Sequence, residues 1–247
     1  MTMKGQQRIH IGTSGWHYKH WQGPFYPDGL PLSGFLEYYA RHFHTAEINN
    51  TFYQLPAEST FVGWLEQVPK DFIFAVKASR YITHMKKLKD AAQTLTPLLE
   101  RVKSLGGNLG PILFQLPPRW NFNLERLNSF LQALPSGHRY AIEFRDPSWL
   151  TDQTYEALAA HQVAFCIYDF AGRLSPKEVT ANLIYLRLHG PAGPYQGCYD
   201  TQFLAGWAGA FATWAAQGKE IFCYFDNDEA GYAVQNAGQL QQMITKG

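Results

Sequence analysis

Short apolar runs and longer amphipathic stretches alternate along the chain, and this alternation is typical of parallel strands covered by helices. Eight runs rich in Ile, Val, Phe, Tyr or Leu have the composition of strands that are buried on both faces. The predicted strands are Arg8–Gly12, Thr45–Asn49, Phe72–Ala78, Pro111–Leu116, Tyr140–Arg145, Val163–Asp169, Leu183–His189 and Ile221–Asp226. Apolar residues at helical spacing fill the segments between them. The predicted helices are Leu32–Arg41, Ser59–Gln67, Ala91–Ser104, Leu124–Ala133, Asp152–His161, Thr201–Gln217 and Gly231–Lys246.

The order of these elements predicts an α/β fold, a (β/α)8 TIM-like barrel. The chain has 247 residues, which is the typical size of that barrel, and no linker or break in composition divides it, so we expect one domain over residues 1–247. The sixth helix is expected to be short or degenerate, because only Phe170–Asn182 separates the sixth and seventh strands. A doubly wound open sheet is the alternative. No G-x-G-x-x-G motif follows a strand, so a dinucleotide-binding half has no support.

Polar residues fall on one face of the predicted strands, near their C-terminal ends. Alternate residues of a barrel strand point inward, and those near its C-terminal end line the mouth where barrel enzymes act. The polar residues with this placement are Glu47, Asn49, Lys77, Ser79, Gln115, Glu143, Arg145, Asp169, Arg187, His189 and Asp226. We predict that they converge on one cavity. They form either a functional site or a network of paired charges that plugs one end of the barrel.

Aromatic residues that follow the strands are expected to wall this polar floor, as in a ligand pocket of mixed polarity. We expect catalysis from Glu47, Lys77, Glu143 and His189. We expect the substrate to contact Trp16, Asn49, Tyr53, Arg80, His84, Gln115, Arg145, Trp149, Arg187, Asp226 and Asn227.

Several motifs resemble those of the YecE-like family, also called domain of unknown function 72. The motifs that carry the resemblance are Ile11-Gly12-Thr13-Ser14-Gly15-Trp16, Glu47-x-Asn49-x-Thr51-Phe52-Tyr53, Lys77-x-x-Arg80, Gln115-Leu116-Pro117-Pro118, Glu143-x-Arg145-x-x-Ser148-Trp149 and Arg187-x-His189-Gly190. The resemblance spans nearly the whole chain. It implies a TIM-like barrel and assigns no activity. Asp226 departs from the family pattern, in which Asn is the expected residue.

Amino-acid composition and net charge limit the kinds of partner that we expect for this protein. Hydrophobic residues make up 46% and aromatic residues 15% of the chain, which excludes a disordered protein. With 21 Lys and Arg against 20 Asp and Glu, the formal charge is +1, so no global field attracts nucleic acid or a membrane surface. Three widely spaced cysteines form neither a disulfide framework nor a zinc ribbon. The polar start and the lack of a long apolar run predict a cytoplasmic protein without a membrane partner.

Two kinds of chemistry fit these residues poorly. Glu47 and Glu143 could flank a glycosidic bond, but a neighbouring arginine keeps Glu143 ionised, whereas a general acid needs a raised pKa. A metal site would use Glu47, Glu143, Asp169, His189 and Asp226, yet cationic side chains crowd the same space. The sequence therefore assigns no metal, and it assigns no cofactor or oligomeric state.

An anion site fits better, because Lys77, Arg80, Arg145 and Arg187 lie at or after the ends of different strands. The arginine fork matches phosphate or carboxylate, and the loop Gly190–Gly197 is placed to close over such a group. We predict an enzyme that acts on a small phosphate- or carboxylate-bearing metabolite, with a hydrolase or lyase favoured. The alternatives are a barrel that binds or cleaves nucleic acid, with rim cations and aromatics to hold it, and a barrel that binds a ligand without catalysis.

Overall fold

The computed structural model of the chain describes residues 8–246. Within them the strands are β1 (Ile9–Thr13), β2 (Thr45–Ile48), β3 (Ile73–Lys77), β4 (Leu109–Gln115), β5 (Tyr140–Glu143), β6 (Ala164–Phe170), β7 (Arg173–Leu174), β8 (Leu183–Leu188) and β9 (Glu220–Phe225). The α-helices are α2 (Phe35–Ala40), α3 (Glu58–Leu65), α4 (Ala91–Val102), α5 (Leu124–Ala133), α6 (Asp152–Ala160), α7 (Thr201–Ala216) and α8 (Tyr232–Lys246). Single helical turns are η1 (Lys19–Trp21), η2 (Leu32–Gly34), η3 (Asn50–Phe52), η4 (Tyr81–Met85), η5 (Lys103–Asn108) and η6 (Pro147–Trp149).

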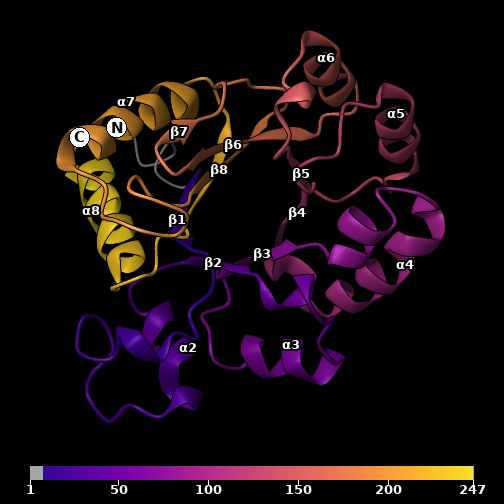
Figure 1. Cartoon of the computed structure of the whole chain (residues 1–247). Coiled ribbons are helices and arrows are strands. Elements are labelled where there is room, and N and C mark those ends of the chain that lie inside the picture. Colours follow the sequence, from indigo (N-terminus) through magenta and orange to yellow (C-terminus); the bar gives the residue numbers. More distant parts are fainter. Residues whose placement is uncertain (1–7, 247) are drawn as a thin grey trace.

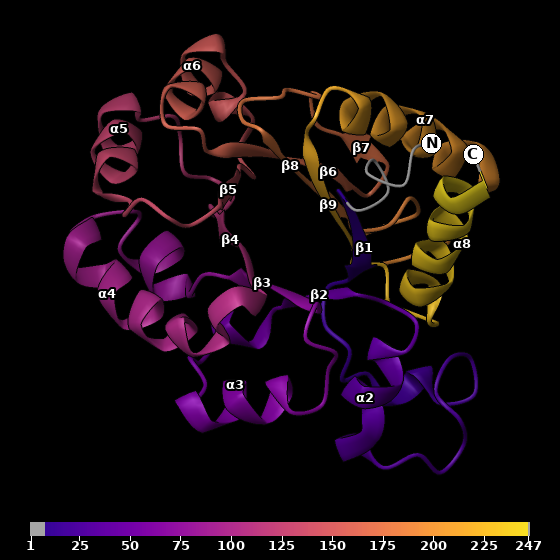
Figure 2. The same ribbon diagram turned by 180° about the vertical axis from the view of Figure 1, so that it is seen from behind.

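The strands form a nearly closed parallel barrel with helices outside it (Figure 1). Around the barrel the order is β1, β9, β8, β6, β5, β4, β3 and β2, so strands that follow one another in the chain are neighbours in space. The view from behind shows the same ring of strands enclosed by helices (Figure 2). The predicted TIM-like barrel is confirmed. The open doubly wound sheet is wrong, because its strand order would reverse partway across the sheet.

The ring closes between β1 and β2 through few backbone contacts. A single bridge pairs Ser14 with Glu47, and Gly15 N–H donates to the Glu47 carbonyl at 2.9 Å. Above this bridge the Tyr39 hydroxyl accepts from the Thr13 amide at 2.9 Å and donates to the Thr45 carbonyl at 3.1 Å. One buried side chain of α2 thus replaces the strand-to-strand hydrogen bonds at the seam.

Tyr39→Phe is expected to lower the free energy of unfolding by about 1–3 kcal/mol, because the Thr13 amide would be left buried without an acceptor. Urea unfolding measures this loss. Tyr38→Phe on the same helix is the control, because Tyr38 is only partly buried and packs on the edge of the core. Equal stability of the two variants would contradict a structural role for the Tyr39 hydroxyl.

The sixth β/α unit, between β6 and β8, contains a hairpin in place of a helix. Ala171 and Gly172 both have positive φ, at 54° and 72°, and they turn the chain so that β7 pairs antiparallel with the end of β6. The Ser175 amide then donates to the Tyr168 carbonyl at 2.8 Å. The expectation of a degenerate sixth helix is confirmed, and the hairpin that replaces it extends beside the mouth.

Two separate apolar regions hold the barrel. Between the strands and the helices lies the larger one, and Trp16 and Trp149 belong to it. A smaller region fills the barrel interior below the polar mouth and includes Ala75, Leu113 and Tyr185. None of the helices between residues 8 and 246 combines the length and apolar character that crossing a bilayer requires.

Candidate active site at the C-terminal mouth

The guanidinium of Arg187, near the C-terminal end of β8, is at the centre of the mouth and is fully buried. An arginine side chain has five N–H donors, and here they contact groups from five places in the sequence. The partners are Glu47 Oε1 at 2.8 Å, Glu143 Oε2 at 2.9 Å, Asp226 Oδ2 at 3.0 Å, Ser14 Oγ at 3.0 Å and His189 Nε2 at 3.3 Å. Nε also donates to Glu47 Oε1, at 3.2 Å, so the protein itself uses all three nitrogens of this guanidinium.

Three carboxylates surround this arginine, and two of them, Glu143 and Asp226, are held in their charged form. Burial alone would raise the pKa of Glu143, but Arg145 and Arg187 outweigh it and hold the pKa well below its ordinary value. The same opposition between burial and Arg187, helped by the hydrogen bond from His189, lowers the pKa of Asp226. Glu47 also accepts hydrogen bonds from the Ser14 hydroxyl and, at 2.6 Å, from the Tyr185 hydroxyl.

His189 lies among two carboxylates and two guanidinium groups; its Nε2 is 3.6 Å from Glu143 Oε1, and the closer contacts with the arginines set the tautomer. Nε2 faces Arg145 Nη2 at 2.8 Å and Arg187 Nη1 at 3.3 Å, both of which can only donate. The ring proton is therefore on Nδ1, which donates to Asp226 Oδ2 at 2.9 Å. This Asp–His pair has the arrangement of an oriented general base whose Nε2 is covered by Arg145.

Arg145 differs from Arg187 because much of its guanidinium is free. Its Nε is ion-paired with Glu143, and its Nη2 donates a hydrogen bond to His189 Nε2. Within residues 8–246 no group accepts a hydrogen bond from its Nη1. The guanidinium carbon lies 4.3 Å from the ring centroid of Phe170 and 5.2 Å from that of Tyr168. The carboxylate, the histidine and the two rings hold the fork in place, and its remaining donors are available to a ligand.

Lys77 ends β3 and is half-buried. Its Nζ lies over the ring of Phe52, 4.4 Å from the centroid. Burial and the positive charge of Arg187 lower the pKa of this lysine to about 8, although the mouth carboxylates oppose the shift. Phe52 also contacts the ring of His84, with 5.0 Å between centroids.

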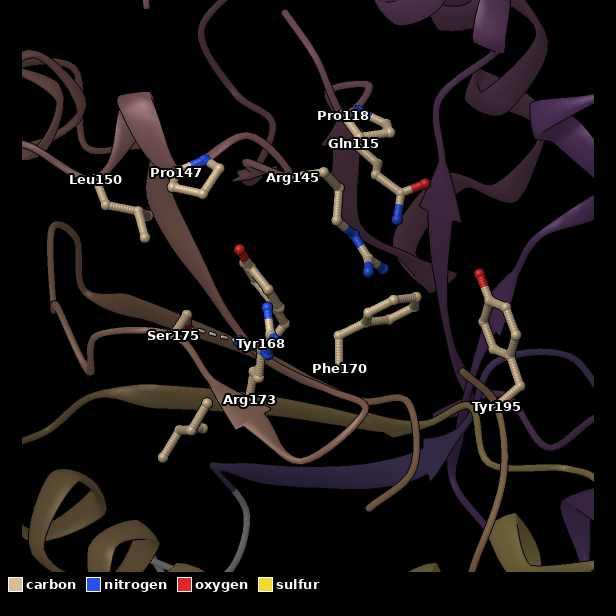
Figure 3. A pocket seen from close by; sticks show the side chains of 11 residues that line it. Gln115, Pro118, Arg145, Pro147, Leu150, Tyr168, Phe170, Arg173, Ser175 and Tyr195 are labelled. Carbon is tan, nitrogen blue, oxygen red and sulfur yellow. Dashed lines mark hydrogen bonds between the residues drawn. The ribbon is translucent and has the colours of Figure 1, made fainter. Parts of the chain in front are cut away.

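A cavity of about 480 Å³ opens beside Arg145 (Figure 3). Its lining residues are Gln115, Pro118, Arg145, Pro147, Leu150, Tyr168, Phe170, Arg173, Leu174, Ser175 and Tyr195. The side chains of Gln115 and Arg145 reach toward the ring of Phe170 in the close-up view (Figure 3). Gln115 donates to Glu143 Oε1 at 2.9 Å, so the cavity directly joins the charge network. The volume is that of a site for a small molecule.

The structure brings most of the predicted inner residues together. Glu47, Glu143, Arg145, Arg187, His189, Gln115 and Asp226 form one network of ion pairs and hydrogen bonds. Lys77 is close enough to have its pKa shifted by Arg187, Glu47, Glu143 and Asp226. Asn49 follows β2 and is half-buried, and its Oδ1 has no partner among the described residues.

Five placements differ from the expectation. Trp16 and Trp149 are buried in the helix-side core, against Trp64 and Phe144 for example, and do not wall the mouth. Asp169 faces away from the cavity, because Tyr168 and Phe170 on either side of it line the cavity; its Oδ2 accepts from the Tyr199 hydroxyl at 2.8 Å.

The other two corrections concern buried residues with no donor for a ligand. Arg187 was expected to bind the substrate, but its donors are already occupied. Asn227 is also fully buried, and its amide donates to the Gly197 carbonyl and to Asn236 Oδ1, both at 2.9 Å. Asn227 therefore holds the loop Gly190–Gly197 in place.

The remaining predicted contacts lie at the rim of the mouth. Tyr53 is 74% exposed, Arg80 is exposed and His84 is half-buried. Burial and the charges of Lys77 and Arg80 lower the pKa of His84. The loop Gly190–Gly197 contributes Tyr195 to the cavity wall.

Tyr168, Phe170 and Arg173 line the cavity but are not among the residues that the sequence pattern predicts for the site. All three belong to the β/α unit between β6 and β8, where the only signal in the sequence is the absence of a predicted helix. On β6 the inward positions were assigned to Asp169 and its alternate residues, whereas the structure points Tyr168 and Phe170 inward. Arg173 lies on a strand of only two residues, which is too short to show any periodicity.

The donor set of the mouth is a poor fit to a metal ion. Within the described part of the chain, no three side chains of His, Cys, Asp or Glu are grouped so that they could hold one. Glu47, Glu143 and Asp226 already accept hydrogen bonds from Arg187.

The chain belongs to the family described as "Protein of unknown function DUF72", whose model matches residues 10–247. UPF0759 protein YecE of Escherichia coli (strain K12) is 33% identical over 142 residues, which cover 57% of this chain and only half of that protein's length. UPF0759 protein YunF of Bacillus subtilis (strain 168) is 26% identical over 277 residues, with 96% of this chain and 94% of that protein covered.

Solved structures of the same family have the same fold. A DUF72 family protein of Thermotoga maritima MSB8 superimposes with a TM-score of 0.86 at 30% identity, over 96% of this chain and 99% of that one. A DUF72 family protein of Enterococcus faecalis V583 gives a TM-score of 0.81 at 22% identity, over 96% and 95% of the two chains. These proteins support the barrel and leave the activity to be argued from the mouth itself.

Proposed function

We propose that the protein is an enzyme that acts on a small anionic metabolite, bearing a phosphate or carboxylate, at the C-terminal mouth of the barrel. One observation carries the proposal. Of the eleven residues that line the cavity, all in the described part of the chain, two are arginines and none is acidic. A cavity with this lining attracts an anion, and the arginine fork matches the oxygens of carboxylate or phosphate.

Arg145 is the main anchor in this proposal. Its orientation is already fixed by Glu143, His189 and the ring of Phe170, so little side-chain freedom remains to be lost when a ligand binds. Arg173 on β7 adds a second, exposed cation, and the hydroxyls of Tyr168 and Tyr195 add polar contacts on the wall.

Two groups beside the cavity support catalysis as opposed to binding alone. The His189–Asp226 pair provides an oriented base next to the cavity, and its Nε2 is hydrogen-bonded to Arg145, the residue that would hold the anion. Lys77 provides an amine whose pKa, about 8, allows proton transfer or nucleophilic attack near neutral pH. Proton transfer next to an anionic group is the chemistry of hydrolases and lyases, which are the reaction classes we favour.

Arg145→Gln is expected to weaken binding of the best ligand from a panel of sugar phosphates, nucleotides and small carboxylates by about tenfold or more, because one or two charge-assisted hydrogen bonds are lost. Arg145→Lys should weaken it nearly as much, since the charge stays and the fork is lost. Titration calorimetry measures both variants against Arg139→Gln, which removes an arginine far from the mouth.

Three outcomes would overturn all or part of the proposal. No binding by the wild-type protein to any member of the panel would remove the anion site. Strongly salt-dependent binding to a single-stranded oligonucleotide without binding to the panel would favour the nucleic-acid alternative. Anion binding without turnover of any panel member would favour the non-catalytic barrel.

A further inference from the structure

Lys77 is a charged side chain of the mouth that lacks an ionic partner. Within residues 8–246 no carboxylate lies within ion-pair distance of its Nζ, which lies over the ring of Phe52 at 4.4 Å. The reason is the competition with Arg187. That guanidinium holds Glu47, Glu143 and Asp226 at 2.8–3.0 Å, so the acceptors that would pair with a lysine are already engaged.

Charges from several elements face Lys77. Arg187 of β8, together with burial, disfavours the ammonium, whereas Glu47, Glu143 and Asp226 favour it. His84 of η4 lies within electrostatic range, because its own pKa is lowered by Lys77 and Arg80. The resulting pKa of about 8 leaves about a tenth of the amine uncharged at pH 7, far more than the ordinary value of 10.5 would leave.

We propose that the Lys77 amine forms an imine with the carbonyl carbon of an anionic aldehyde or ketone, such as a 2-oxo acid or a phosphorylated aldehyde, bound in the mouth. This inference rests on the proposed function, because the anion site brings the carbonyl group to the amine. It adds the class of substrate, a carbonyl compound, and a covalent role for one residue.

Lys77 is within reach of the cavity. It pairs with Leu113 of β4, and Gln115, two residues further along the same inner face, lines the cavity. Strand spacing and rise place the Cα atoms of Lys77 and Gln115 about 8 Å apart. A lysine side chain spans most of that distance, so an anion held by Arg145 could present its carbonyl group to Nζ.

The covalent step balances without a further reactant. The lone pair of the neutral amine attacks the carbonyl carbon while the C=O π electrons move to oxygen, which takes one of the two amine protons. The nitrogen lone pair then forms the C=N bond as the oxygen takes up a proton from solvent and leaves as water, so the imine nitrogen keeps the second amine proton and is positively charged. The protonated imine withdraws electrons from the adjacent C–H or C–C bond, and this is the use that a lyase makes of such an intermediate.

The chain offers a matched control lysine. Lys86 also lies over an aromatic ring, that of Tyr81, at 5.8 Å from the centroid. Unlike Lys77 it is paired with a carboxylate, Asp90, at 3.3 Å, and the hydrogen bond to this partner raises its pKa. The two lysines therefore differ in pairing and burial while sharing a ring contact, so they should differ in reactivity toward aldehydes.

The test uses pyridoxal 5′-phosphate as an anionic aldehyde and pyridoxal as the same aldehyde without the phosphate, each followed by borohydride reduction and peptide mapping by mass spectrometry. We expect the phosphate probe to label Lys77 about tenfold faster than Lys86, with the Lys77 rate rising through a midpoint near pH 8. Pyridoxal should label Lys77 more slowly than the phosphate probe does. Lys77→Arg should abolish this label while retaining phosphate binding, and Arg145→Gln should remove only the advantage of the phosphate.

The two proposals can fail separately in this experiment. Phosphate binding by calorimetry with no selective label at Lys77 would overturn the imine and leave the proposed function standing. Labelling of Lys77 at equal rates by the two probes, with no phosphate binding, would overturn the proposed function and with it the anionic substrate class. Labelling of Lys77 no faster than Lys86 by either probe would overturn the covalent role itself.

Discussion

Replacing Arg187 by methionine is expected to lower the free energy of unfolding by about 3–5 kcal/mol at pH 7, measured by urea unfolding. The substitution retains most of the side-chain volume and removes the cation that Glu47, Glu143 and Asp226 share. Three buried carboxylates would then face one another with only Arg145 and Lys77 nearby. Their mutual repulsion and lost hydration are the source of the expected loss.

The pH dependence of this effect has a definite sign. In the wild-type protein the pKa values of Glu143 and Asp226 are lowered, so these carboxylates stabilise the fold above their ordinary pKa, and this stabilisation is lost as the pH falls through the folded-state pKa. Without Arg187 the carboxylates would protonate more easily in the folded state. The difference in stability between Arg187→Met and wild type should therefore shrink as the pH is lowered from 7 toward 4.

The control for this prediction is an arginine at the other end of the barrel. Arg139 pairs with Glu220 at 2.7 Å, but both side chains are about one-third exposed. Arg139→Met should cost at most about 1 kcal/mol, because water replaces the lost partner. A loss for Arg187→Met no larger than this would show that its carboxylates are solvated and that the mouth is not a buried network.

Regular strands made much of this site predictable from sequence. Glu47, Lys77, Glu143 and Arg187 fall on the inward parity of runs whose other residues are apolar, and inward parity near a strand's C-terminal end leads to the mouth whatever the neighbouring loops do. The predicted strand Leu183–His189 agrees with β8 to within one residue at its C-terminal end. Periodicity therefore predicted these four inner side chains, whereas Asp169, which it also placed inward, faces away from the cavity.

Periodicity does not say which partners these side chains choose. Arg187 pairs with all three carboxylates because of strand tilt and side-chain reach, which the periodicity does not show. These pairs make Arg187 an internal support, whereas it was expected to contact the ligand. Loops are harder still, since Trp16 and Trp149 follow strand ends but turn outward between helices. Arg173 is found only once the turn at Ala171 and Gly172 is known to fold β7 back beside the mouth.

The sequence left two interpretations of the inner polar residues open, a plug of paired charges and a functional site. The charge network in the structure has features of both. Arg187 acts as the plug, because it is fully buried and its donors are all used by the protein. Arg145 and Lys77 have the character of a site, because each has polar hydrogens without an acceptor in the described part of the chain. A buried plug that engages the carboxylates leaves these two cations free for a ligand.

Glu143→Ala is expected to lower the free energy of unfolding by about 3–5 kcal/mol, because Glu143 is the carboxylate that both arginines share. Its Oε2 accepts from Arg187 Nη1 at 2.9 Å, and its Oε1 accepts from Gln115 at 2.9 Å and pairs with Arg145. Without it the two guanidinium groups would repel each other, and Arg187 is fully buried. Glu143→Gln should lose less, since an amide oxygen still accepts a hydrogen bond.

A double-mutant cycle separates this coupling from the loss of packing. The Glu143→Ala/Arg187→Met variant should be more stable than the sum of the two single losses predicts, by about 1–3 kcal/mol, because neither charge is then left without the other. The same cycle on Glu220 and Arg139 should give a coupling below about 1 kcal/mol, because that pair is partly exposed. Additive losses for Glu143 and Arg187, or a thermal midpoint for Glu143→Ala equal to that of wild type, would contradict a buried pair. The anchoring of Arg145, on which the anion site depends, would then need another explanation.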